Sequence, residues 1–118
     1  MRIVIGGYRS FNDYELIVKH LDRLLAPYDP SNIVFLSGHC SGVDLLAERY
    51  AEEHGLTVER HPAEWEHYGR AAGPIRNEQM VMQADGVIAF WDGQSRGTKS
   101  LISYAKKHGK KLHVISIG

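Results

Sequence analysis

The chain has 118 residues, in which 14 lysines and arginines balance 14 aspartates and glutamates. Domains average about 150 residues, so this length predicts one domain spanning residues 1–118. With 43% hydrophobic and 24% charged residues, the composition excludes a disordered, collagen-like or coiled-coil chain. The zero net charge argues against a nucleic-acid partner but leaves room for a local basic pocket.

The cysteine content and the apolar runs bear on compartment. Cys40 is the single cysteine, so neither an intramolecular disulfide nor a CxxC pair can form. No apolar run approaches the roughly 20 residues that span a bilayer, so we expect no membrane segment. The apolar start of the chain is also too short for a signal peptide. The expected location is cytoplasmic.

Strands and helices alternate in the first half of the chain. The β-branched residues 3–5 predict a buried strand that the following glycines end. Asn12 and Glu15 form a capping-box pattern ahead of a helix that stops at Pro27. A second apolar strand covers residues 33–36, and a helix with Ser41 as its expected N-cap follows.

The second half continues the alternation. Residues 57–61 alternate weakly and predict an edge strand, and residues 62–74 predict a long loop or short helical turns. The remaining predicted elements are a helix over residues 74–83, a strand over 86–91, a helix over 98–108 and a strand over 112–117.

The central strands are apolar on both faces, which requires helices on both sides of a parallel sheet. Right-handed crossovers then predict an α/β, doubly wound, mainly parallel five-stranded sheet of order 3-2-1-4-5, a Rossmann-like fold. Ligands bind such sheets beyond the carboxyl ends of the strands, where the strand order reverses. The glycine-rich loops after strands 1, 2 and 4 should all open onto that crevice.

The first two loops suit an anionic ligand. Gly7 permits a tight turn, and Arg9 could hold an anion, although a solvated arginine would explain it equally. The loop matches neither a dinucleotide-binding GxGxxG nor a Walker sequence. Gly38 and Gly42 lead into a helix N-terminus that favours phosphate. Asp44 would contact a ribose hydroxyl there or simply complement the helix dipole.

The loop after strand 4 repeats this pattern. Gly93 and Gly97 precede Thr98, whose hydroxyl could donate to a phosphate or cap its own helix. Trp91, at the end of the strand, is either part of the core or a platform on which a base stacks.

The segment from Tyr68 to Glu78 is the most unusual in composition. It places Arg70, Arg76 and Asn77 beside glycines and a proline. A cation at a helix start opposes the dipole, so Arg76 suggests a binding site; a surface loop is the alternative. As a site residue outside the core, Arg76 should contribute little to stability.

No metal site or cofactor is predicted. The seven histidines include no HxH or HxxxH pair and no carboxylate at ligand spacing. Cys40 has His39 beside it in sequence, but an incidental thiol is the favoured interpretation.

Several motifs together resemble a known family over almost the whole chain. They are Gly7-Tyr8-Arg9, Ser37-Gly38, Gly42-x-Asp44, Pro62-Ala63-Glu64-Trp65, the stretch YGRAAGPIRNEQM from Tyr68 to Met80, and Ser95-Arg96-Gly97-Thr98. The chain resembles the YspA/YpsA-like branch of the SLOG superfamily, which includes the DNA-processing protein DprA and the LOG hydrolases. The resemblance implies a Rossmann-like nucleotide-binding fold. It also implies that Gly97 and Thr98 line the phosphate and that Arg76 and Asn77 sit at the ligand.

Two departures from the pattern affect the expected activity. The related phosphoribohydrolases carry a GGxGTxxE loop, and here the glutamate position falls on Leu101. The second glycine of the usual pair after strand 2 is His39. The first departure removes the expected catalytic carboxylate, so hydrolase activity does not carry over from the resemblance. A binding or sensing role fits better.

The sequence therefore favours a module that binds or senses a nucleotide or nucleotide derivative. One alternative is a phosphoribohydrolase-like enzyme that cleaves an N-glycosidic bond, with Asp44, Glu64, Glu78 and Asp85 as candidate acid/base groups. Another is a protein-interaction domain on a degenerate nucleotide fold. Whether the protein is an enzyme stays open. The expected partners are a nucleotide-like small molecule and, because small sheets with exposed apolar helix faces often pair, a second copy of the chain.

Overall fold

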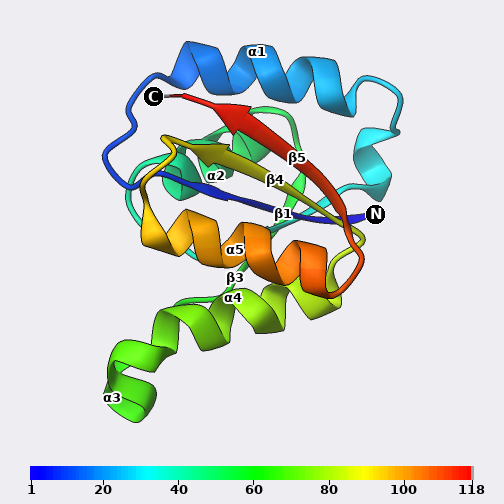
Figure 1. The fold of residues 1–118 in the computed structure, drawn as a ribbon. Helices are drawn as coiled ribbons and strands as arrows, with labels where there is room; N and C mark the ends of the chain where they lie inside the picture. Colours follow the sequence, from blue (N-terminus) through cyan, green and yellow to red (C-terminus); the bar gives the residue numbers. More distant parts are fainter. Residues whose placement is uncertain (118) are drawn as a thin grey trace.

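Five parallel strands form the centre of the fold, seen in a computed structural model that describes residues 1–117 (Figure 1). The strands are β1 (Arg2–Gly7), β2 (Val34–Ser37), β3 (Thr57–Arg60), β4 (Gly86–Trp91) and β5 (Lys111–Ser116). Their order is β3-β2-β1-β4-β5, and every neighbouring pair is parallel. The predicted class and strand order are confirmed. The order reverses between β1 and β4, where a ligand crevice is expected.

Helices cover both faces of this sheet. The helices α1 (Tyr14–Leu25) and α2 (Val43–Glu53) pack on one face, while α4 (Ala72–Gln83) and α5 (Arg96–Lys107) pack on the other. The short helix α3 (Trp65–Tyr68) lies beyond the N-terminal end of α4, away from the body of the sheet (Figure 1). No helix within residues 1–117 is long and apolar enough to cross a membrane.

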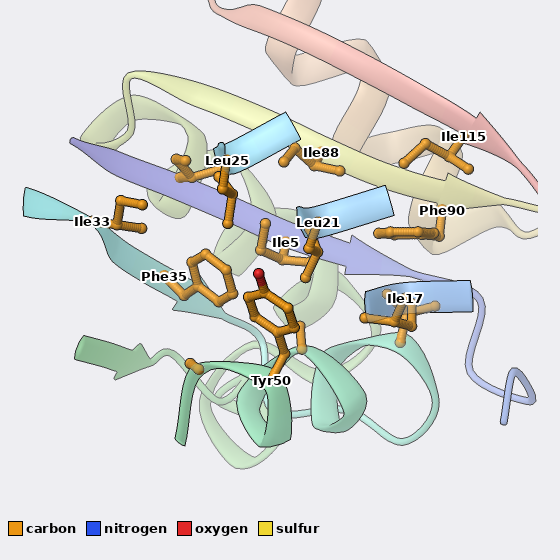
Figure 2. Close-up of a cluster of buried hydrophobic side chains, with 14 residues drawn as sticks. Ile5, Ile17, Leu21, Leu25, Ile33, Phe35, Tyr50, Ile88, Phe90 and Ile115 are labelled. Carbon is orange, nitrogen blue, oxygen red and sulfur yellow. The ribbon is translucent and has the colours of Figure 1, made fainter. Parts of the chain in front are cut away.

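Two hydrophobic clusters hold these layers together. Figure 2 shows the larger one, in which Ile5, Phe35 and Phe90 point from the sheet towards α1 and α2. Val4 and Leu36, next to two of these residues in sequence, belong to the cluster under α4 and α5. Successive side chains of a strand point to opposite faces, so a sheet covered twice needs continuous apolar strands.

Several boundaries differ from the sequence-based predictions, and each difference has a local cause. The N-cap of α1 is Asp13, not Asn12, because its carboxylate accepts a hydrogen bond from the backbone N–H of Leu16. Gly42 rather than Ser41 precedes α2, with a φ of 78° that glycine adopts without strain. Of the two predictions for residues 62–74, helical turns are confirmed: α3 and a 3₁₀ turn at Gly69–Ala71.

Two helix starts change the interpretation of candidate site residues. Helix α4 begins at Ala72, before Pro74, because a proline in the first turn loses no intrahelical hydrogen bond. Arg76 is therefore one turn into the helix, so the argument from an unfavourable dipole was wrong. Helix α5 begins at Arg96 with Ser95 as its N-cap. Thr98 thus does not cap the helix, and its hydroxyl donates to Ser95 Oγ at 3.2 Å.

Candidate functional site

The loops after β1, β2 and β4 meet at the carboxyl edge of the sheet around a cleft of about 100 Å³. The structure brings seven of the predicted site residues to this cleft: Gly7, Arg9, Asp44, Arg76, Asn77, Gly97 and Thr98. Cys40, Ser95 and Leu101 also line it. The crevice predicted from topology is therefore present, and residues far apart in sequence share it.

Three glycines at this edge are required by close packing. A Cβ on Gly7 would lie 2.3 Å from the carbonyl oxygen of Phe90, and one on Gly42 would lie 2.3 Å from that of Tyr8. A Cβ on Gly38 would lie 2.7 Å from Arg76 Nη1. The fold alone therefore explains Gly7, Gly38 and Gly42, whether or not a ligand binds beside them.

Gly97 is different from these three. It lies in the first turn of α5, lacks a positive φ, and a Cβ built on it would meet no atom within 4 Å. Its carbonyl accepts a hydrogen bond from Asn77 Nδ2 at 3.2 Å. A side chain would project into open space at the cleft rather than into the protein.

Arg76 is a buried structural element of the cleft, with 7% of its surface exposed. Its Nη1 donates to the carbonyl oxygens of Gly38 at 2.8 Å and His61 at 3.3 Å. Its Nε donates to Asn77 Oδ1 at 2.9 Å. The prediction that Arg76 lies outside the core was wrong, because its side chain is buried. The guanidinium ties α4 to the segments that follow β2 and β3.

Asp44 supplies the carboxylate of the cleft. It is 6% exposed and accepts a hydrogen bond from the backbone N–H of Cys40 at 3.3 Å. Burial raises the pKa of Asp44 to about 6, although backbone hydrogen bonds from Cys40 and Gly7 and the charge of Arg76 pull it down. A carboxyl group with this pKa can exchange a proton near neutral pH.

The other candidate acid/base groups lie elsewhere. Glu78 accepts hydrogen bonds from Lys107 and His108, at the far end of α5 from the cleft. Asp85 accepts from the backbone of Arg2, at the opposite edge of the sheet. Glu64 is exposed before α3. Within residues 1–117, Asp44 is the one carboxylate that lines the cleft.

Four predicted binding residues do not line the cleft: Gly38, Gly42, Arg70 and Trp91. Arg70 is exposed in the 3₁₀ turn before α4. Trp91 is partly buried, and its indole N–H donates to the carbonyl oxygen of Ser95 at 3.1 Å, which braces the loop before α5. Gly38 lies in close contact with the Arg76 guanidinium, and Gly42 with the carbonyl oxygen of Tyr8.

Sequence reasoning missed a polar network beside the cleft. Glu48 in α2 is 5% exposed and accepts hydrogen bonds from Ser37 Oγ, His39 Nδ1 and Arg60 Nε at 2.7, 2.9 and 2.7 Å. Burial alone would raise its pKa, but these hydrogen bonds hold the pKa of Glu48 below its usual value. The network holds the loop in which His39 has a φ of 57°. The signal available in the sequence was the position of Glu48, which directly follows Ala47 of the apolar stripe of α2.

No group of histidine, cysteine, aspartate and glutamate side chains within residues 1–117 is placed to hold a metal ion. The arrangement of the cleft instead combines backbone N–H groups at the start of α5, arginines and one carboxyl group. The first N–H groups of a helix have no partner inside it, so they are available to an anion.

Comparison with known proteins identifies the family. The model of the YspA, cpYpsA-related SLOG family matches residues 1–68. The chain belongs to this SLOG family. The Gene 61 protein of Mycobacterium phage D29 is 34% identical to it over 127 residues, which cover 99% of this chain and 96% of that protein. No solved structure matches the chain. The matched part of this SLOG chain runs from β1 through α3, so Arg76, Gly97 and Thr98 lie beyond it.

The burial of Arg76 generates a first prediction. Replacing it with alanine would leave the Gly38 carbonyl without its donor and Asp44 without its neighbouring positive charge. Arg76→Ala should therefore lower the free energy of unfolding by about 2–4 kcal/mol in a urea titration. The exposed Arg70→Ala is the matched control and should change it by less than about 0.5 kcal/mol. Equal unfolding midpoints for the two variants would refute the structural role.

The raised pKa of Asp44 generates a second prediction. The folded protein holds the proton of the Asp44 carboxyl group more tightly than the unfolded chain does. The protonated carboxyl group therefore stabilises the folded protein fully below pH 3.8, and this stabilisation is lost as the pH rises through about 6. The shift corresponds to about 3 kcal/mol. Urea titrations from pH 4 to pH 8 should show wild type losing stability relative to Asp44→Asn over this range. Parallel curves for the two proteins would contradict the assignment.

Proposed function

We propose that this SLOG protein binds a nucleotide or nucleotide derivative whose phosphate lies in the cleft against the first turn of α5. The observation on which this proposal rests is the glycine at position 97. Neither its φ nor any neighbouring atom requires a glycine at position 97. A ligand that approaches this turn closely would explain it, and a phosphate is the group that helix N-termini favour.

The charges around the cleft support the same ligand. Arg9 and Arg76 line it, and Arg96 lines the pocket next to it, in a chain whose formal net charge is zero. Thr98, 3% exposed, adds a hydroxyl in the same helical turn as Gly97. Asp44 contributes an acceptor from α2 that suits a sugar hydroxyl. Membership of a SLOG family supports a nucleotide-related ligand in general terms.

Binding without turnover, as in a sensor, is the form of this function that we favour. Leu101 occupies the position of the glutamate in the GGxGTxxE loop of the hydrolases that the chain resembles. It is 3% exposed, and its Cδ2 lies 2.8 Å from where a Cβ on Gly6 would be. An aliphatic side chain packed against β1 can neither activate water nor stabilise positive charge on a sugar.

The third prediction tests the ligand class by thermal shift. Nucleoside monophosphates, dinucleotides, cyclic nucleotides and ADP-ribose should include a compound that raises the Tm, with its unphosphorylated nucleoside raising it much less. A ligand at a hundred times its Kd adds about 2.7 kcal/mol of stability. If no phosphate compound stabilises the protein at millimolar concentration, the proposed function is wrong.

A glycine variant makes this test specific to the cleft. Gly97→Ala should keep or raise the Tm of the free protein, since alanine is the better helix former and its methyl group meets no atom. The ligand-induced shift should nevertheless fall, because the methyl group would occupy the phosphate site. Ser103→Ala, on the exposed face of the same helix, is the matched control and should leave the shift unchanged. A full shift in Gly97→Ala would move the ligand away from α5.

One observation favours a second candidate function, hydrolysis of an N-glycosidic bond. A buried carboxyl group with a pKa of about 6, such as Asp44, is suited to general acid/base work at neutral pH. Among residues 1–117, no carboxylate other than that of Asp44 lines the cleft. Glycosidases usually use a pair, so this candidate ranks second.

The fourth prediction separates the two functions. Incubation of nucleoside monophosphates with the protein should release free base no faster than a protein-free control, measured by chromatography. Loss of one general acid/base group costs on the order of 10²–10⁴ in rate, which is the deficit expected at the Leu101 position. Base release that Asp44→Asn abolishes would establish the hydrolase instead.

A further inference from the structure

A second pocket, of about 190 Å³, adjoins the cleft. The two share Arg9, Arg76, Asn77 and Gly97 as lining residues, so they lie next to each other around these four residues. The residues that line only the second pocket are Trp65, Gly73, Pro74, Arg96 and Ser100. This pocket therefore lies between α3, the start of α4 and the start of α5, on the α3 side of the molecule (Figure 1).

Trp65 forms the aromatic wall of this pocket. Half of its surface, 50%, is exposed, although α3 packs against α4. Its Cη2 lies 3.4 Å from where a Cβ on the buried Gly73 would be, so the ring rests on a surface that has no side chain. The glycine lets the indole lie close to α4 while the rest of the ring stays open. A large aromatic side chain left open beside a charged cleft suits a stacking partner.

Two cations line the same pocket. Arg9 and Arg96 are both exposed, and neither makes an ion pair in the part of the chain that the structure describes. A guanidinium group can bind a phosphate with its N–H edge and stack on an aromatic ring with its face. Ser100 lines the pocket from the first half of α5.

We propose that this second pocket is the base subsite, in which the heteroaromatic ring of the ligand stacks on Trp65 while its phosphate occupies the adjoining cleft. The inference rests on the proposed function and deepens it. The two pockets share four residues, so the ligand must carry the ring and the phosphate close together, as a nucleoside monophosphate or ADP-ribose does. The stacking residue is Trp65 rather than Trp91, because the indole N–H of Trp91 donates a hydrogen bond to the carbonyl oxygen of Ser95 in the following loop.

Calorimetric titration of wild type, Trp65→Phe and Trp65→Ala with the four common nucleoside monophosphates and with ribose 5-phosphate tests the subsite. Loss of base stacking costs about 1–3 kcal/mol, so Trp65→Ala should weaken nucleoside monophosphate binding about 5- to 150-fold. Trp65→Phe should recover part of the affinity. Ribose 5-phosphate has no heteroaromatic base and should bind wild type and Trp65→Ala equally.

Fluorescence provides a second readout, because the chain has two tryptophans. In Trp91→Phe the indole of Trp65 is the only one, and a nucleoside monophosphate stacked on it should change its emission. Ribose 5-phosphate should leave the emission unchanged. An unchanged emission on saturation with a nucleoside monophosphate would overturn the subsite.

The possible failures are distinguishable. If wild type binds neither ribose 5-phosphate nor any nucleotide or nucleotide derivative of the thermal-shift panel, the proposed function fails and the subsite with it. If wild type and Trp65→Ala bind the same nucleoside monophosphate equally, only the subsite is overturned and the phosphate cleft stands. If Trp65→Ala leaves the affinity intact but changes the elution volume in size-exclusion chromatography, the indole covers a contact between copies, which also overturns the subsite.

Discussion

The hydrogen bond from the buried Arg76 guanidinium to the Gly38 carbonyl is the contact on which the geometry of the cleft depends. It joins α4 to the end of β2, on the two sides of the point where the strand order reverses. Asn77 accepts from the same guanidinium and donates to Gly97, so the linkage extends to α5. One arginine thus fixes three segments that are distant in sequence. A Cβ on Gly38 would lie 2.7 Å from Arg76 Nη1, so any side chain there would displace that guanidinium.

The sequence predicts the class, strand order and location of the crevice because these follow from local patterns. Continuous apolar strands alternating with helices leave few topologies, and the topology places the loops after β1, β2 and β4 together. The glycines of those loops were visible as well. The sequence pattern does not show why a glycine occupies each of these positions. Gly7, Gly38 and Gly42 prevent clashes, whereas Gly97 leaves a space open, and only the surrounding atoms distinguish these cases.

Side-chain burial and pairing account for the predictions that failed. From the sequence alone, an arginine in a glycine-rich segment is expected to be exposed. In the structure Arg76 is buried, and the carbonyl oxygens of Gly38 and His61 accept hydrogen bonds from its guanidinium. Trp65 and Trp91 both stand beside loops in the sequence. The indole of Trp91 binds the carbonyl of Ser95, whereas that of Trp65 faces a pocket. Such choices depend on contacts between segments far apart in the chain, which local periodicity does not encode.

Charge within the cleft would link the binding of the proposed phosphate to the protonation of Asp44. Asp44 and Arg76 both lie close to Gly38, near enough for the arginine to lower the pKa of the carboxyl group, and both are buried, so water does not screen them fully. A phosphate entering the same cleft would bring negative charge towards Asp44 and raise its pKa further. Since that pKa is already about 6, a dianionic ligand would bind together with a proton at neutral pH. Protonation of Asp44 would remove the repulsion between its carboxylate and the phosphate.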